Sequence, residues 1–317
     1  MPLPETWSGD SGAEAQVGNL FSAFNTAAFA DGAYVHVERD RELERPIEIL
    51  HLSVGMDEPH MAQPRHLILL EQGARAHLIE RHFSYGNATY FNNAVMEVQL
   101  DTGFCLHHMR IQEESAQAFH MNSQFVQHGA CSNYRGIGVA LGGAWSRNEM
   151  RVDFEGEAAN CDICGLYVVG DGQLSDQHLE VQHRVPGCTS REDFRGVLNG
   201  RGRGVFDGRI WVEKDAQKSD ARLSNANLLL SRQAEIDTKP QLEILADDVK
   251  CAHGTTVGQI EDEALFYMQS RGIPRRKAQQ MICLGFARTA FENSGIEALD
   301  RYLETAVAQR LNSEVTS

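Results

Sequence analysis

The stretch KPQLEILADDVKCAHGTTVGQIEDEALFYMQSRGIPRRKAQQMICLGFARTAF, residues 239–291, changes its structural period near its middle. Leu242 and Ile244 alternate with polar residues just after a proline, which predicts a β-strand. From Glu261 onward the apolar residues follow a helical spacing instead, and Gly272 is placed to end that helix. The sequence therefore predicts that a β domain gives way to a helical region within this stretch.

A thiol and an imidazole stand two residues apart just before the change of period. If Cys251 and His253 are extended, their side chains share one face, roughly 6–7 Å apart. A soft thiolate and an imidazole nitrogen at that distance can hold a metal ion or a sulfur species. The spacing alone is a weak signal, because seven Cys and thirteen His residues give about 0.3 such pairs by chance. A buried Cys beside a hydrogen-bonded His remains the alternative.

Short strand-like segments follow one another through most of the chain, with Gly, Asn or Asp in the gaps. They comprise residues 47–52, 66–70, 77–81, 95–100, 105–112, 134–141, 150–155, 165–169, 178–184, 194–198, 209–212, 227–231 and 242–245. Regular short strands without intervening helices suit a sandwich, a barrel or a β-solenoid. Strand spacing does not choose among the three.

Helical patterns are confined to the two ends of the chain. A short one follows residue 19, and three more are expected at residues 261–270, 274–291 and 296–311. The sequence thus predicts a flexible lead-in over residues 1–18, a β domain over 19–258 and a helical domain over 259–317. Such a helical domain either caps the last coil of the β domain or docks a partner protein.

Several long strings resemble the D-type subunits of the SufB/SufD family, which form a scaffold for iron–sulfur cluster assembly. They read TKPQLEILADDVKCAHGTTVGQ, LFYMQSRGI, AQKSDARLSNANLLLS and CTSREDFRGVLNGRGRGVFDGRIWV. The B-type subunit typically carries a Glu-His-Glu-like string where this chain has Cys251-Ala252-His253-Gly254. The resemblance extends from about residue 19 to about residue 311. The family usually has a longer helical N-terminal region, so a truncated chain or a short variant is expected here.

The resemblance implies a fold, a site and partners. It implies a mainly β fold, a right-handed parallel β-helix followed by a small C-terminal helical lobe. It implies that Cys251 and His253 face a transient, nascent iron–sulfur cluster at the interface with a SufB-type subunit, which pairs through strand edges. The helical lobe would dock the SufC-type ATPase, while this chain binds no nucleotide and is not an enzyme. Alone, the chain is expected to form a homodimer through the unpaired edge.

Composition excludes several other classes of protein. A net charge of −15 argues against a nucleic-acid partner, where basic surface supplies most of the affinity. No apolar run approaches the roughly 18 residues of a membrane span, and the N-terminus lacks the pattern of a secretory signal. Seven cysteines, an odd and scattered set, favour free thiols in a reducing compartment. We therefore expect a cytoplasmic protein.

Other motifs carry less weight. Cys105 and His107 are expected to be packing and surface residues of the β domain. Cys161-x-x-Cys164 lacks the second cysteine pair of a zinc site. The string from Gly200 to Gly204 has no following Lys-Ser/Thr and is expected to be a surface turn, not a phosphate loop. The alternative function is a β-helix or cupin-like metalloenzyme with a His/Cys metal centre, which would show turnover on its own.

Overall fold

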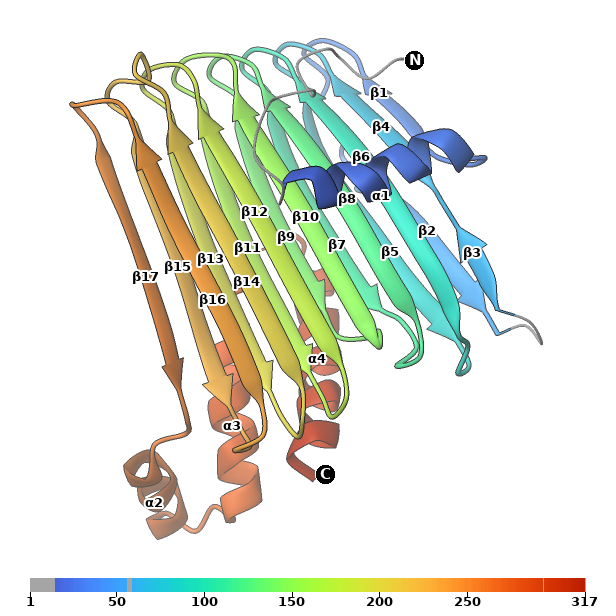
Figure 1. Ribbon diagram of the computed structural model, residues 1–317, viewed down its shortest axis with the longest axis vertical. Coiled ribbons are helices and arrows are strands. Elements are labelled where there is room, and N and C mark those ends of the chain that lie inside the picture. The colour runs from blue at the N-terminus through green and yellow to red at the C-terminus, as the bar shows by residue number, and fades with distance from the viewer. Residues whose placement is uncertain (1–14, 56–58, 293, 317) are drawn as a thin grey trace.

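Two parallel β-sheets form the body of the molecule in the computed structural model, which describes residues 15–55, 59–292 and 294–316 (Figure 1). The first sheet has the strand order β1-β4-β6-β8-β10-β12-β14-β16, with β3 also paired to β6, and the second has the order β17-β15-β13-β11-β9-β7-β5-β2. From β4 onward, successive strands alternate between the two sheets. The chain is therefore a parallel β-helix, as the resemblance implied.

The strands of the first sheet are β1 (Tyr34–Val37), β3 (His60–Ala62), β4 (Arg65–Leu70), β6 (Tyr90–Leu100), β8 (Phe119–His128), β10 (Trp145–Phe154), β12 (Leu174–His183), β14 (Arg203–Val212) and β16 (Glu235–Ile244). The strands of the second are β2 (Ile47–Val54), β5 (Arg75–Tyr85), β7 (Cys105–Glu113), β9 (Asn133–Ala140), β11 (Asn160–Val169), β13 (Thr189–Leu198), β15 (Asp220–Leu229) and β17 (Lys250–Gly258).

The coils stack in register, so equivalent positions form rows through the molecule. Trp145 pairs with Leu174, which pairs in turn with Arg203, and one coil here takes 29 residues. Alternate residues of each strand point inward, as in β14, where Phe206, Ile210 and Val212 are fully buried. The interior between the two sheets is one continuous core over much of its length.

Four strands escaped the sequence prediction: β1, β3, β8 and β17. The reason is clearest in β8, FHMNSQFVQH, where the inward residues His120, Asn122, Gln124 and His128 are polar yet buried. A strand that turns polar residues toward the interior has no apolar alternation for a sequence pattern to detect.

The helices are α1 (Ala15–Ala28), α2 (Asp262–Ser270), α3 (Arg275–Arg288) and α4 (Glu297–Thr316). The short N-terminal helix was expected, but α1 begins inside the predicted lead-in; residues 1–14 lie outside the described part. It lies across the outer face of the first sheet, where Asn25 donates hydrogen bonds to the Pro64 and Asn93 carbonyls (Figure 1). The three C-terminal helices confirm the predicted helical region.

Helices α3 and α4 cover the outer face of the second sheet (Figure 1). Cys283 and Phe291 pack with Leu303 against apolar residues of β7, β9 and β11. Tyr302 of α4 donates a hydrogen bond to the Glu113 carboxylate. The guanidinium carbon of Arg81 lies over the Tyr302 ring, 4.7 Å from the ring centroid. The helices therefore share a core with the side of the β-helix and leave its last coil uncovered. Within the described residues, no helix is long and apolar enough to cross a membrane.

Candidate functional site

The β-helix ends in two edge strands, β16 and β17, each paired on one side only, to β14 and β15 respectively (Figure 1). An edge strand presents a row of unpaired N–H and C=O groups to a partner. Pro240 lies within β16, and its missing N–H falls on the free side, because the N–H groups of Glu235 and Leu245 both point to β14. This is where a sheet tolerates proline. The edge of β17 has no such interruption.

The two edge strands, and Leu245 just after β16, also carry exposed apolar side chains. Ile244 is 39% exposed, Leu245 54% and Val257 51%. Apolar residues on an uncovered strand edge are unfavourable in water and normally mark a contact with another chain. The end of the β-helix thus combines free backbone groups with apolar surface, which together suit strand-to-strand pairing.

Cys251 and His253 both lie on β17, within this edge. They occupy alternate positions of one strand, so their side chains share a face, opposite Ala221 and Leu223 of β15. Cys251 is half-buried against the interior core, whereas His253 is exposed. The predicted extended geometry is confirmed, and the pair sits in a strand of its own after a turn from β16. Their role as ligands remains a prediction.

The electrostatic surroundings of Cys251 favour the protonated thiol. Burial raises the pKa of the Cys251 thiol, the carboxyl groups of Asp220 and Glu192 raise it further, and the Ala221 backbone N–H lowers it in part. The thiol therefore stays protonated in the isolated chain at neutral pH. A bound metal ion or a sulfur-carrying partner must displace that proton before Cys251 acts as a soft ligand.

Glu192 is a residue near this site that sequence reasoning missed. It lies on β13, pairs with Leu223 and is only 1% exposed. Neither carboxyl oxygen makes a hydrogen bond of ordinary geometry among the described residues, although the nearby Ser190 hydroxyl lowers the pKa of this group in part. Burial raises the pKa of Glu192 to about 8, so this buried carboxyl group holds a proton at neutral pH. No local sequence signal distinguishes it, because its burial results from the stacking of coils.

Replacing Glu192 with glutamine is expected to raise the free energy of unfolding at about pH 8 by about 1–3 kcal/mol. The folded chain keeps the Glu192 proton up to about pH 8, whereas the unfolded chain loses it near its ordinary value of 4.5. Stability therefore falls as pH rises through that window, and glutamine removes the fall. Urea unfolding at about pH 6 and about pH 8 checks this, with exposed Glu235→Gln as the control. An equal gain at both pH values would contradict it.

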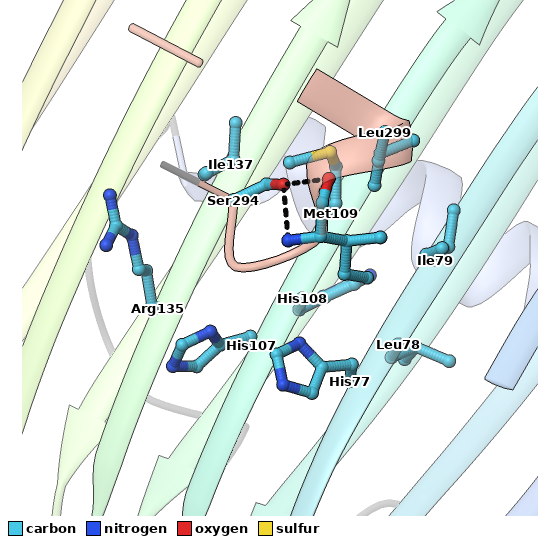
Figure 2. Close-up of a pocket in the computed structure, with 11 residues that line it drawn as sticks. His77, Leu78, Ile79, His107, His108, Met109, Arg135, Ile137, Ser294 and Leu299 are labelled. Carbon is cyan, nitrogen blue, oxygen red and sulfur yellow. Dashed lines mark hydrogen bonds between the residues drawn. The ribbon is translucent and has the colours of Figure 1, made fainter. Parts of the chain in front are cut away.

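Cys105 and His107 of β7 point away from the interior, to the sheet face beneath the α3–α4 connection. Figure 2 shows His107 beside His77, with ring centroids 4.7 Å apart, in a small cavity closed by Ser294. The cavity volume is about 10 Å³, enough for about one water molecule. Burial lowers the pKa of His107. The arrangement agrees with the expected packing role.

The Cys161–Cys164 pair and the glycine-rich string also agree with their structural interpretations. Cys161 is buried and Cys164 half-buried, and burial raises the pKa of both thiols, to about 12 for Cys164. Both are therefore inert thiols. Gly200 forms a turn with a φ of 59°, and Arg201 after it binds Asp171 of the preceding coil. The first part of the string is the surface turn that was predicted, whereas Arg203 and Gly204 already belong to β14.

A comparison with known protein families identifies the family of this chain. Residues 52–286 match the family described as "SUF system FeS cluster assembly, SufBD core domain". The chain belongs to the SufBD family. The match covers the β-helix from within β2 to α3, so both Cys251 and His253 fall inside it.

Relatives in this family extend over most of the chain. It is 34% identical over 280 residues to the iron–sulfur cluster assembly protein SufD of Escherichia coli, covering 88% of this chain and 66% of that protein. It is 33% identical over 302 residues to a SufBD family iron–sulfur cluster assembly protein of Synechocystis, covering 92% of this chain and 66% of that protein. It is also 29% identical over 282 residues to the chloroplastic protein ABCI7 of Arabidopsis thaliana. The chain thus covers 66% of the length of the first two of these proteins and 59% of ABCI7, in each case less than two thirds.

Proposed function

We propose that this chain is a non-catalytic scaffold subunit on which iron–sulfur clusters are assembled. In this proposal a SufB-type subunit pairs with the free edges of β16 and β17. The observation that carries it is the placement of Cys251 and His253 on that edge strand, beside exposed apolar side chains. Family membership supports the assembly role.

The nascent cluster, as cargo, would sit between the two subunits. Cys251 and His253 supply two ligands, and an iron–sulfur cluster is usually held by four. The remaining ligands must come from the paired chain, or from a second copy of this one. The free edge therefore supports both the heterodimer and, without the SufB-type subunit, a homodimer.

In this proposal the SufC-type ATPase binds to α2, a helix with exposed aromatic side chains. Of the residues in α2 only Leu265 is buried, whereas Phe266 is 73% exposed and Tyr267 is 59% exposed. Ala264, Leu265 and Met268 form an apolar stripe on the other side of α2, and this stripe is buried or half-buried against the protein. Basic residues 275–277 at the start of α3 flank these aromatics. Exposed aromatics are the side chains that most often dominate binding energy at interfaces.

The double variant Phe266→Ser/Tyr267→Ser is expected to weaken binding of the SufC-type ATPase at least about tenfold, because it removes both aromatic anchors. Its thermal stability should change little, since both side chains are exposed. A pull-down against the purified ATPase measures the effect, with Gln269→Ala on the same helix as control. Undiminished capture would show that α2 is not the docking helix.

Co-expression with SufB-type and SufC-type subunits tests the proposed function as a whole. One complex containing all three proteins is expected to co-purify, and this chain alone is expected to hydrolyse no ATP. Failure to co-purify with the SufB-type subunit would contradict the scaffold role. Turnover by the isolated chain would favour the metalloenzyme alternative.

A further inference from the structure

A second cluster of polar side chains lies inside the β-helix toward its N-terminal end, away from Cys251. It consists of His51 on β2, Glu80 and His82 on β5, Glu114 just after β7, and His120 on β8. Apart from half-buried His51, each of these residues is at most 6% exposed. No sequence pattern predicts this cluster, because its members come from successive coils, and only the stacking brings them together.

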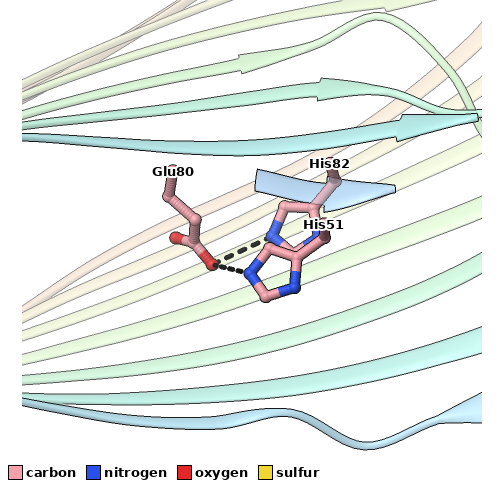
Figure 3. A group of neighbouring side chains, drawn as sticks. All are labelled: His51, Glu80 and His82. Carbon is pink, nitrogen blue, oxygen red and sulfur yellow. Dashed lines mark hydrogen bonds and ion pairs between the residues drawn. The ribbon is translucent and has the colours of Figure 1, made fainter. Parts of the chain in front are cut away.

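Three of these residues converge on one point. His82 Nε2 lies 2.9 Å from Glu80 Oε1, and His51 Nε2 lies 3.9 Å from the same oxygen. The two imidazole rings are stacked, with centroids 4.3 Å apart and planes 6° from parallel (Figure 3), so one ring must turn about its Cβ–Cγ bond for both in-plane lone pairs to meet one ion. Ligands of a tetrahedral metal ion bound at 2.0–2.1 Å stand about 3.3 Å apart. The two observed distances bracket that value.

Several buried polar atoms in and beside the cluster have no hydrogen-bond partner among the described residues. They are the Nε2 atoms of His51, His66 and His120 and the Oδ1 atom of Asn92. Buried polar groups are normally hydrogen-bonded, so a group of unpaired donors and acceptors in one interior space calls for a partner that no side chain supplies.

We propose that His51, Glu80 and His82 bind a divalent transition-metal ion, zinc or ferrous iron, inside the N-terminal coils. Two imidazoles and one carboxylate form a ligand set that suits both ions and leaves coordination positions open. His120 and Glu114 stand on the other side of His82, which belongs to both three-residue groups. This site is separate from the proposed cluster ligands and does not rest on the proposed function.

The surrounding residues are placed to orient these ligands. His82 Nδ1 lies 3.1 Å from the Asn92 side-chain amide. Turning that amide over places its unpaired Oδ1 where it accepts a hydrogen bond from His82 Nδ1–H, which directs Nε2 toward the metal ion. His108 Nε2 lies 3.6 Å from the second oxygen of Glu80. Metal-binding histidines and carboxylates are usually held by such outer contacts.

The protonation states of His51 and Glu80 suit metal binding. Burial lowers the pKa of His51 to about 3, and the neighbouring His82 lowers it further, although Glu80 opposes this. Burial raises the pKa of Glu80, but hydrogen bonds from His108 and His82 outweigh it and hold that pKa well below its usual range. A neutral imidazole and an ionised carboxylate are the forms that coordinate a metal ion.

The interior also has an entry route. His51 lies on β2, an edge strand paired only to β5, and its side chain is 15% exposed. The adjacent His66, whose ring centroid lies 4.9 Å from that of His51, lines a surface pocket of about 550 Å³ beside β1 and β4. An ion therefore reaches the site from the N-terminal end of the β-helix, opposite the end that carries Cys251.

The test uses the purified full-length chain, stripped of metal with a chelator and titrated with Co²⁺ as a spectroscopic probe and with Zn²⁺ in chelator competition. We expect one tightly bound ion per chain. His82→Gln and His51→Ala should each weaken binding at least about 100-fold. The half-buried position of His51 makes its variant the safer one for folding, which circular dichroism and thermal unfolding will check.

Two controls make the result specific. His128→Gln changes a buried interior histidine that is hydrogen-bonded to Ser132 and lies outside the cluster, so it should leave binding unchanged. The double variant Cys251→Ala/His253→Ala should also leave it unchanged. A folded wild-type chain that binds no ion would overturn the proposal. So would a site lost with Cys251 and His253 but retained in His51→Ala.

Discussion

Replacing Val257 with proline is expected to weaken pairing with the SufB-type subunit by about tenfold to a hundredfold while the chain itself stays folded. Lys250 N–H donates to the carbonyl of Ser219, the residue just before β15, 2.9 Å away. Because successive peptide groups of a strand point to alternate sides, the Val257 N–H points to the free edge. Proline removes that donor and keeps the bonds to β15. Each lost buried hydrogen bond costs about 1–3 kcal/mol.

Val257→Ala is the matched control, because it shortens the side chain but keeps the N–H group. Isothermal titration or a quantitative pull-down with the SufB-type subunit measures the difference. If proline and alanine at this position bind equally well, the partner does not pair along β17. Unchanged thermal unfolding of the proline variant would show that the effect belongs to the interface.

Cys251→Ala and His253→Ala are each expected to lower the iron and acid-labile sulfide content of the reconstituted complex about tenfold or more. Each variant removes one of the two ligands that this chain offers to the cluster, and loss even of supporting groups around a metal costs 10–100-fold in affinity. Folding should be nearly unaffected, since His253 is exposed and Cys251 half-buried on an edge strand. Normal iron and sulfide content in both variants would refute their role as ligands.

The change from strand to helix after β17 could be predicted to within a few residues. Glu261 was expected to start a helix, and α2 begins at Asp262. Gly272 has a φ of 83°, the left-handed conformation that follows a helix end, and α3 begins directly after Pro274. These signals are local, because they depend on the backbone preferences of single residues.

The placement of the C-terminal helices on the sheet could not be predicted. Leu166 and Val168 of β11 point outward, yet both are buried because α3 and α4 cover that face. A strand buried on both faces has a continuous apolar sequence. Such a sequence predicts burial, but it does not predict which element covers the strand. The same limit applies to the interior: Glu80 and His120 are ordinary polar residues in sequence, and only the register of the coils brings them together.

Two residues of the candidate site, Cys251 and His253, and the strand face that they share could be predicted from the sequence. The strand β17 itself was not predicted, because its sequence KCAHGTTVG has few apolar residues and one of its faces is exposed. Glu192, whose effect on Cys251 crosses two neighbouring strands, was not predicted either. Such contacts arise from stacking about 30 residues apart, a separation at which no local pattern operates.

The most direct test of the central claim is the acid-labile sulfide bound by this chain alone and by its complex with the SufB-type and SufC-type subunits, after identical reconstitution with iron and sulfide. Sulfide separates a cluster from any single metal ion held inside the β-helix. We expect little sulfide on the isolated chain and a stoichiometric amount on the complex, which is lost when Cys251 and His253 are replaced. A monomer of this chain carrying a full, stable cluster would contradict it.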